Sequence, residues 1–215
     1  MTSTIKIDFV SDVSCPWCVI GLKSLEAALV RLLGDITADL HFQPFELNPQ
    51  MAPEGQNIVE HIAQKYGATP EQSAQTRAMI RERAAGVGFE MRTSEASRIY
   101  NTFDAHRLLH WAGLEGRQAA LKHAMFKAYF TDGAVMSDRS TLADIAEGAG
   151  LDRDAAAEIL AGDSYADEVR SQERFFQEQG INSVPAIIIN DKHLISGGQP
   201  VEIFERALRE IAAAV

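Results

Sequence analysis

The sequence predicts an α/β fold in which a sheet-containing domain is interrupted by a large all-helical segment. Residues 1–49 alternate between strand and helix patterns, and residues 50–163 show helix signals with almost no strand signal. Residues 164–215 return to a helix, two short strands and a final helix. We therefore expect residues 1–49 and 164–215 to form one domain, into which residues 50–163 are inserted as a helical domain.

The N-terminal region predicts a strand, a helix and a second strand. Ile5, Ile7 and Phe9 alternate with polar residues, which is the period of a strand. A leucine-rich helical face follows and is expected to end at Gly34. Residues 36–47 alternate again and predict the second strand. This order is a β-α-β unit.

Helix start signals recur through the middle of the chain. Residues 69–72 read Thr-Pro-Glu-Gln, which combines an N-cap, a proline at the first helical position and a capping-box glutamine. Ser94 is expected to start a helix that runs through Ile99 to Leu109. Residues 164–167 resemble a capping box before another helix. Further helices are expected over residues 121–130, 141–147 and 155–160.

The C-terminal region predicts a hairpin and a last helix. Residues 185–189 form a continuous apolar run, as expected of a strand buried on both faces. Asn190 and Asp191 predict a turn into a second strand over residues 193–195. Two glycines at 197–198 then precede an amphipathic helix.

Composition describes an ordinary globular protein and limits its partners. Of the 215 residues, 46% are hydrophobic and 23% are charged. The formal net charge of -10 argues against nucleic acid and against an anionic membrane surface as partners. No segment approaches the roughly 18 apolar residues of a membrane span, and the N-terminus lacks the basic and apolar pattern of a secretory signal. We therefore expect a cytoplasmic protein.

The most informative motif is Ser-Cys-Pro-Trp-Cys at residues 14–18, where the first strand gives way to a helix. Cysteines three positions apart on a first helical turn have Cα atoms about 5–6 Å apart, which suits a disulfide. A loop this small would add only about 2 kcal/mol as a structural staple. We therefore interpret Cys15 and Cys18 as a redox-active pair that needs no bound cofactor.

The two cysteines are expected to have different roles. Cys15 begins the helix, where unpaired N–H groups and the macrodipole favour a thiolate nucleophile. Cys18 lies one turn further in and is better placed to stay protonated until it resolves a mixed disulfide. Pro16 suits the first helical turn because it lacks an N–H donor, and Trp17 offers an apolar wall beside the sulfurs.

A zinc site is the structural alternative for this pair. Zinc sites that are closed need four ligands, and the sequence has no other cysteines. His106 and His110 share a helix face, but the residues between them lack the glutamate of a metalloprotease motif. We therefore predict no metal. Asp12 is expected to cap a surface turn rather than relay a proton, and His106 to be an ordinary hydrogen-bonded helix residue.

Together these motifs resemble the DsbA family of thioredoxin-fold proteins and, within it, the FrnE-like branch of cytosolic dithiol-disulfide oxidoreductases. The resemblance lies in residues 15–18 and in Gly-Ile-Asn-Ser-Val-Pro at 180–185, with further likeness at 101–108 and 195–200. It implies a thioredoxin-like domain with the helical insertion after its second strand. It also implies protein-disulfide oxidoreductase or disulfide isomerase activity on thiol- or disulfide-containing proteins or small molecules.

The resemblance further assigns a substrate-binding surface. It implies that the bond between Val184 and Pro185 is cis and faces Cys15. In such folds the loop before this proline pairs with an extended substrate, a form of strand addition. Pro16 and Trp17 are expected on the same substrate side, with Val184 and Pro185.

Two other functions stay open. Kappa-class glutathione transferases and 2-hydroxychromene-2-carboxylate isomerases share this architecture but typically carry serine at the position of Cys15. Their glutathione-gripping Ser-Asp pair appears here as Gly198 and Gln199. Glutathione is still expected as a thiol partner, because a helix N-terminus attracts its carboxylate. The second alternative is a chaperone or binding module without redox turnover. The direction of exchange depends on the reduction potential and is left open, as is the oligomeric state.

Overall fold

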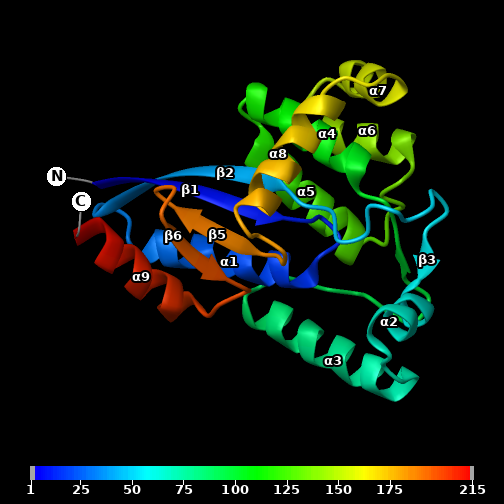
Figure 1. The fold of residues 1–215 in the computed structure, drawn as a ribbon, viewed down its shortest axis with the longest axis horizontal. Coiled ribbons are helices and arrows are strands. Elements are labelled where there is room, and N and C mark those ends of the chain that lie inside the picture. Colours follow the sequence, from blue (N-terminus) through cyan, green and yellow to red (C-terminus); the bar gives the residue numbers. More distant parts are fainter. Residues whose placement is uncertain (1–2, 214–215) are drawn as a thin grey trace.

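A four-stranded mixed sheet forms the centre of the computed structural model, which describes residues 3–213 (Figure 1). The strand order is β2-β1-β5-β6. The long strand β1 (Ser3–Ser11) runs parallel to β2 (Ile36–Pro44) and antiparallel to β5 (Ala186–Ile189). The edge strand β6 (His193–Ser196) pairs antiparallel with β5. The first and last parts of the chain therefore build one sheet.

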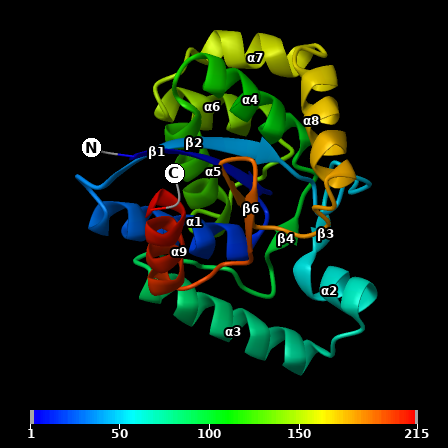
Figure 2. The same cartoon turned by 60° about the vertical axis from the view of Figure 1, so that its left-hand side comes forward.

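Helices α1 (Pro16–Arg31) and α9 (Val201–Ala213) pack side by side on one face of this sheet (Figures 1 and 2). The close approach of α1 to the loop before β5 depends on Gly21. A Cβ at this position would lie 3.1 Å from Pro185 Cγ and 3.3 Å from Gly198 Cα. Glycine is therefore required where the helix meets the loops around β5 and β6.

The segment between β2 and β5 is mainly helical. Helices α4, α5 and α8 pack against β2, and α5 also reaches α1, where His123 pairs with Glu26, whereas α3 lies beside α1 (Figures 1 and 2). Two short strands, β3 (Gln56–Asn57) and β4 (Arg98–Ile99), pair antiparallel within this segment. The helices are α2 (Ile58–Tyr66), α3 (Pro70–Gly86), α4 (Phe103–Leu114), α5 (Gln118–Phe130), α6 (Arg139–Gly148), α7 (Arg153–Ala161) and α8 (Ala166–Glu178).

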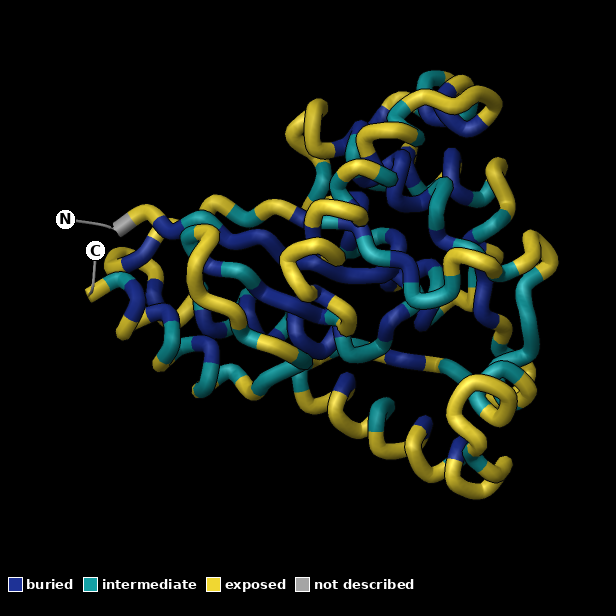
Figure 3. The backbone as a smooth tube through the Cα atoms, viewed as in Figure 1, coloured by how far each residue is buried: buried dark blue, intermediate teal, exposed yellow. Residues whose placement is uncertain are grey.

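Two large clusters of buried apolar side chains form the interior. The first lies between the sheet, α1 and α9, and it contains both cysteines. The second joins α4, α5, α6 and α7 and reaches the end of β1 through Val13. The tube in Figure 3 shows the buried residues concentrated along the sheet and α1. The segment that links β1 to α1 is therefore in contact with both clusters.

The predicted α/β class is confirmed, and so is the capping box at the start of α3. Thr69 Oγ1 accepts from Gln72 N at 3.2 Å, while Gln72 Oε1 accepts from Thr69 N at 2.9 Å. The predicted strand over residues 36–47 is shorter than expected and ends at Pro44. Residues beyond it turn inward, because Leu47 N donates to the Asp12 side chain.

Two predicted helix starts are wrong. Ser94 starts no helix, because its hydroxyl accepts from Ala96 N and its amide donates to Ser97 Oγ, closing a local turn before β4. Residues 164–167 form no capping box. Tyr165 adopts a left-handed conformation with φ of 63° and gives no side-chain cap, while its ring packs on His110. A competing local turn thus replaces the predicted helix start at Ser94, whereas at residues 164–167 Tyr165 packs on a distant residue.

We expect Gly21→Ala to lower the free energy of unfolding by about 1–3 kcal/mol, because the added methyl would overpack the contact with Pro185 and Gly198. Urea denaturation of both proteins measures the difference. Gly148→Ala is the matched control, since it also lies in a helix and no atom lies within 4 Å of an added Cβ. Gly148→Ala should be neutral or raise stability by about 0.5–1 kcal/mol. Equal effects of the two substitutions would contradict the packing argument.

Candidate active site

The two cysteines lie at the N-terminus of α1 and are not joined by a disulfide. Cys15 is the N-cap residue, with φ of -91° and ψ of 114°, and its side chain makes no capping hydrogen bond. Cys15 N donates to Asp12 O at 3.2 Å, and Cys18 N donates to Cys15 O at 3.1 Å. The first sulfur is thus held at the end of the helix, and the second lies one turn inside.

The loop before β5 faces the first sulfur. The Val184–Pro185 peptide bond is cis. The Cys15 thiol donates to the Val184 carbonyl oxygen, with a sulfur–oxygen distance of 3.7 Å. The Pro185 carbonyl accepts from Gly197 N at 2.8 Å, which ties the loop to the end of β6. The structure therefore brings four residues together that are far apart in the sequence: Cys15, Cys18, Val184 and Pro185.

The side chains between the two cysteines are half-buried. Pro16 occupies the first position of α1. Trp17 lies against α3, where the Arg83 guanidinium carbon is 5.7 Å from the centre of the indole ring. An arginine at this distance from an aromatic face makes a cation–π contact. The Trp17 carbonyl oxygen lies close to Gly198, since a Cβ there would be only 2.9 Å away.

The environments of the two thiols differ. Cys15 is 4% exposed, whereas Cys18 is completely buried. Burial raises the pKa of the Cys18 thiol well above its usual value, and the hydrogen bond and charge of Cys15 raise it further. The Lys122 charge and the Asp12 backbone N–H oppose this rise. Cys18 is therefore a neutral thiol at physiological pH in the reduced protein.

Asp12 does not lie on the surface as expected. Its carboxylate is fully buried, accepting from Leu47 N at 2.7 Å and from Ser14 N at 3.0 Å. Burial opposes its ionisation, but the nearby His106 imidazole and the two backbone donors outweigh burial and lower the pKa of the Asp12 carboxyl. The expected turn cap is present, and the predicted surface position is wrong.

Two further buried side chains complete a polar cluster behind the cysteines. His106 Nε2 lies 3.7 Å from Asp12 Oδ1, and within residues 3–213 it has no hydrogen-bond partner. His106 is therefore not the satisfied helix histidine that was expected. Lys122 was not identified from the sequence at all. Its side chain is fully buried on α5. The sequence indicates only that Lys122 lies among apolar residues with helical spacing, and a lysine is seldom fully buried.

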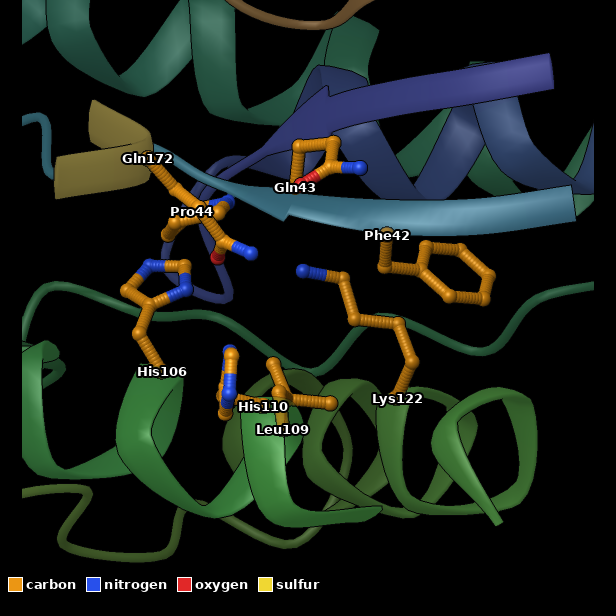
Figure 4. A pocket seen from close by; sticks show the side chains of 8 residues that line it. All are labelled: Phe42, Gln43, Pro44, His106, Leu109, His110, Lys122 and Gln172. Atoms are coloured by element: carbon orange, nitrogen blue, oxygen red, sulfur yellow. The ribbon is translucent and has the colours of Figure 1, made fainter. Parts of the chain in front are cut away.

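Lys122 and His106 point into a small cavity of ≈ 10 Å³ between β2, α4 and α5 (Figure 4). A volume of this size holds about one water molecule. The lining residues are Phe42, Gln43, Pro44, His106, Leu109, His110, Lys122 and Gln172. A larger hollow of ≈ 470 Å³ lies along residues 48–56 and His61, and none of the predicted site residues lines it.

Among residues 3–213, no three histidine, cysteine, aspartate or glutamate side chains gather as they do around a metal ion. Within the same residues, every helix is too short or too polar to cross a bilayer.

The sheet, the helix that begins at a dithiol and the cis-proline loop define a thioredoxin-like α/β protein. Residues 6–209 match the family model of the DSBA-like thioredoxin domain, and the chain belongs to this family. Membership confirms the predicted thioredoxin-like fold and places the chain among DsbA-like thiol oxidoreductases.

Known relatives agree with this assignment. A probable DsbA oxidoreductase of Streptomyces coelicolor, SCO1869, is 34% identical, with a TM-score of 0.92 over 98% of this chain and 90% of that one. YwbO of Bacillus subtilis strain 168, an uncharacterised protein, is 25% identical over 96% of this chain and 97% of its own. A 2-hydroxychromene-2-carboxylate isomerase, 17% identical, has a TM-score of 0.69 over 96% of this chain and 95% of its own. That last likeness shows a shared fold.

We expect Asp12→Ala to lower the free energy of unfolding by about 2–4 kcal/mol at pH 7, because two buried backbone donors lose their acceptor. The folded pKa of Asp12 lies below its ordinary value of 3.8. Its ionised form therefore stabilises the fold above that pH, and this contribution is lost as pH falls through the folded pKa. Urea denaturation from pH 7 to pH 3 checks both points.

The matched control for this experiment is Asp39→Ala, because the Asp39 side chain on β2 is 61% exposed. Its effect should stay within about 0.5 kcal/mol. A cost for Asp12→Ala that does not shrink in acid would contradict the assignment of a buried, ionised carboxylate.

Proposed function

We propose that this protein exchanges disulfides through Cys15 and Cys18, with Cys15 as the nucleophile and Cys18 as the resolving thiol. The observation that carries the proposal is the asymmetry of the pair. Cys15 lies at the helix N-terminus beside Val184, whereas Cys18 is fully buried with a raised pKa. A helix N-terminus favours the thiolate on the first sulfur, and burial keeps the second protonated until it is needed.

In the reducing direction, the Cys15 thiolate attacks one sulfur of a substrate disulfide. A Cys15–substrate bond forms and the other substrate sulfur leaves as a thiolate. Cys18 then loses its proton to solvent and attacks Cys15, releasing the second substrate thiolate and leaving the Cys15–Cys18 disulfide. In the oxidising direction a substrate thiolate attacks Cys15 of that disulfide, and the same bonds form and break in reverse order. Which direction prevails in the cell is set by the reduction potential.

The same proposal gives roles to the surroundings of the sulfurs. Pro16 and Trp17 on α1, with Val184 and Pro185 on the opposing loop, form the substrate-binding surface around Cys15. An extended substrate pairs with the backbone of this loop. Thiol- or disulfide-containing proteins and small molecules, glutathione among them, are the substrates that this chemistry accepts. No bound cofactor is needed, and we retain the FrnE-like assignment and the cytoplasmic location as part of this proposal.

One local contact supports disulfide exchange over glutathione-dependent isomerisation. The isomerases and kappa-class transferases grip glutathione with a Ser-Asp pair at the positions of Gly198 and Gln199. A Cβ at position 198 would lie 2.9 Å from the Trp17 carbonyl oxygen, which is backbone and cannot turn aside. A serine therefore does not fit here without movement of α1. The cysteine at position 15, in place of serine, and the presence of Cys18 also favour disulfide exchange.

We expect Cys18→Ser to accumulate mixed disulfides with its substrates through Cys15, because the resolving thiol is absent. Cys15→Ser should form no adducts and should lose reductase activity by at least about a hundredfold. Incubation with a disulfide-containing peptide and with oxidised glutathione, followed by mass spectrometry of proteolytic fragments, locates each adduct. Adducts that form through Cys18 in the Cys15→Ser variant would show that the roles are reversed.

The double variant Cys15→Ser, Cys18→Ser separates exchange from a chaperone or binding function. The exchange proposal expects it to lose turnover of the disulfide peptide while its melting temperature stays close to that of the reduced parent. Suppression of aggregation of an unfolded client by the double variant, together with a parent protein that shows no turnover, would favour the binding-module alternative.

A further inference from the structure

A buried ammonium group lies behind the cysteine pair without a partner. Lys122 is on α5, and its side chain is 0% exposed. Among residues 3–213, Lys122 Nζ has no hydrogen-bond partner. The nitrogen lies 5.0 Å from the centre of the Phe126 ring and 5.9 Å from that of Phe42. Both rings belong to the buried cluster that also contains Cys15 and Cys18.

An isolated charge in this position destabilises the folded protein. A buried ammonium costs several kcal/mol after relaxation, and two aromatic contacts return about 0.5–2 kcal/mol each. Burial accordingly lowers the pKa of Lys122 from 10.5 to about 8. At neutral pH the group is still mainly charged, and we therefore expect negatively charged groups near it.

The negative charge comes from the segment that links β1 to α1. In their charged forms Cys18, Asp12 and Cys15 each raise the pKa of Lys122, with the effect of Cys18 largest and that of Cys15 smallest. Asp12 already accepts from two backbone donors and lies beside His106. The charge on the sulfurs, by contrast, changes during disulfide exchange, since a disulfide carries none and each thiolate formed in the exchange carries one. Besides Lys122 and His106, the titratable residue that lines the cavity is His110.

We propose that the Lys122 ammonium is the buried positive charge that stabilises the thiolate of the Cys15–Cys18 pair, foremost on Cys18 as it resolves a mixed disulfide. The inference deepens the proposed function and rests on it. In the resolving step, the Cys18 proton leaves to solvent, a bond forms from Cys18 to Cys15, the bond from Cys15 to the substrate breaks, and the substrate leaves as a thiolate. Lys122 forms no bond and keeps its proton. It acts through the charge that develops on Cys18.

The same arrangement influences the equilibrium between the reduced and oxidised protein. When two substrate thiols reduce the disulfide, they become a substrate disulfide, and the protein gains one thiolate and one thiol, with one proton released to solvent. The positive charge of Lys122 stabilises the thiolate of the reduced protein and has no such effect on the uncharged disulfide. The protein is therefore a stronger oxidant with the lysine than without it.

Neutral variants of Lys122 separate this role from a structural one. Lys122→Met keeps the length of the side chain and removes a charge that has no hydrogen-bond partner. Replacing a buried charge with an apolar residue is commonly neutral or stabilising. We therefore expect Lys122→Met to unfold at the same or a higher urea concentration than the parent. Lys122→Gln serves as a second neutral variant, and Lys127→Met, which removes an exposed lysine from the same helix, is the matched control.

The first measurement is the equilibrium of each protein with reduced and oxidised glutathione at pH 7. Free thiols are alkylated, and mass spectrometry measures the fractions of reduced and oxidised protein. We expect both neutral variants to shift it about tenfold toward the protein disulfide, which corresponds to one pKa unit of lost thiolate stabilisation. The single-turnover rate of resolving a preformed Cys15 mixed disulfide should fall by about the same factor. Lys127→Met should match the parent in both.

A second measurement does not require exchange activity. In the Cys15→Ser background, the alkylation rate of Cys18 by iodoacetamide at pH 7 follows the thiolate fraction of Cys18 alone, at a pH where Lys122 is mainly charged. Lys122→Met should lower this rate about tenfold, which corresponds to one pKa unit. A parent that never forms mixed disulfides would refute the proposed function, and the alkylation rate would still test the role of Lys122.

Several results would overturn the role of Lys122. An unchanged alkylation rate of Cys18 at pH 7 in a folded neutral variant is one. A glutathione equilibrium and resolving rate within twofold of the parent are another. Failure of both neutral variants to fold would assign the ammonium to the fold, against the expectation from its unpartnered environment.

Discussion

The arrangement of the site depends on how closely α1 can approach the loop before β5. The contact between the Cys15 sulfur and the Val184 carbonyl exists because two glycines, Gly21 and Gly198, lie where any side chain would meet Pro185 or the Trp17 backbone. The parallel pairing of β1 with β2 and the antiparallel pairing of β1 with β5 then hold both sides of this contact in one sheet. The sulfur and the loop are thus positioned by backbone packing and by the register of the sheet.

The helical segment also contributes to the site and does not only cover the sheet. The connection from β1 to α1 is where the two apolar clusters meet, with Val13 in the cluster of α4 to α7 and the cysteines in the other. Asp12 lies between them and connects to the chain after β2 through Leu47. Lys122 reaches the same place from α5. The surroundings of the dithiol therefore combine Asp12 from the β1–α1 link with Lys122 from the helical segment.

The features that were predicted correctly depend on neighbouring residues in the sequence, although not every local pattern was predictive. The spacing of Cys15 and Cys18 and the capping box at Thr69 involve a single helical turn. The helix expected at Ser94 was lost to hydroxyl contacts that form an equally local turn. Lys122 and the burial of Asp12 follow from the packing of α5 and β1, which no short pattern encodes. The Val184–Pro185 contact was inferred from family resemblance, and the strand pattern alone did not indicate it.

The burial of Cys15 bears on what the protein can meet. Cys15 is only 4% exposed, and its sulfur lies 3.7 Å from the Val184 carbonyl oxygen. Under the proposed exchange, an unstructured stretch of polypeptide or a molecule as small as a tripeptide would reach such a thiol more readily than a disulfide buried in a rigid, folded surface. Substrate shape would then select among thiols independently of their reduction potentials.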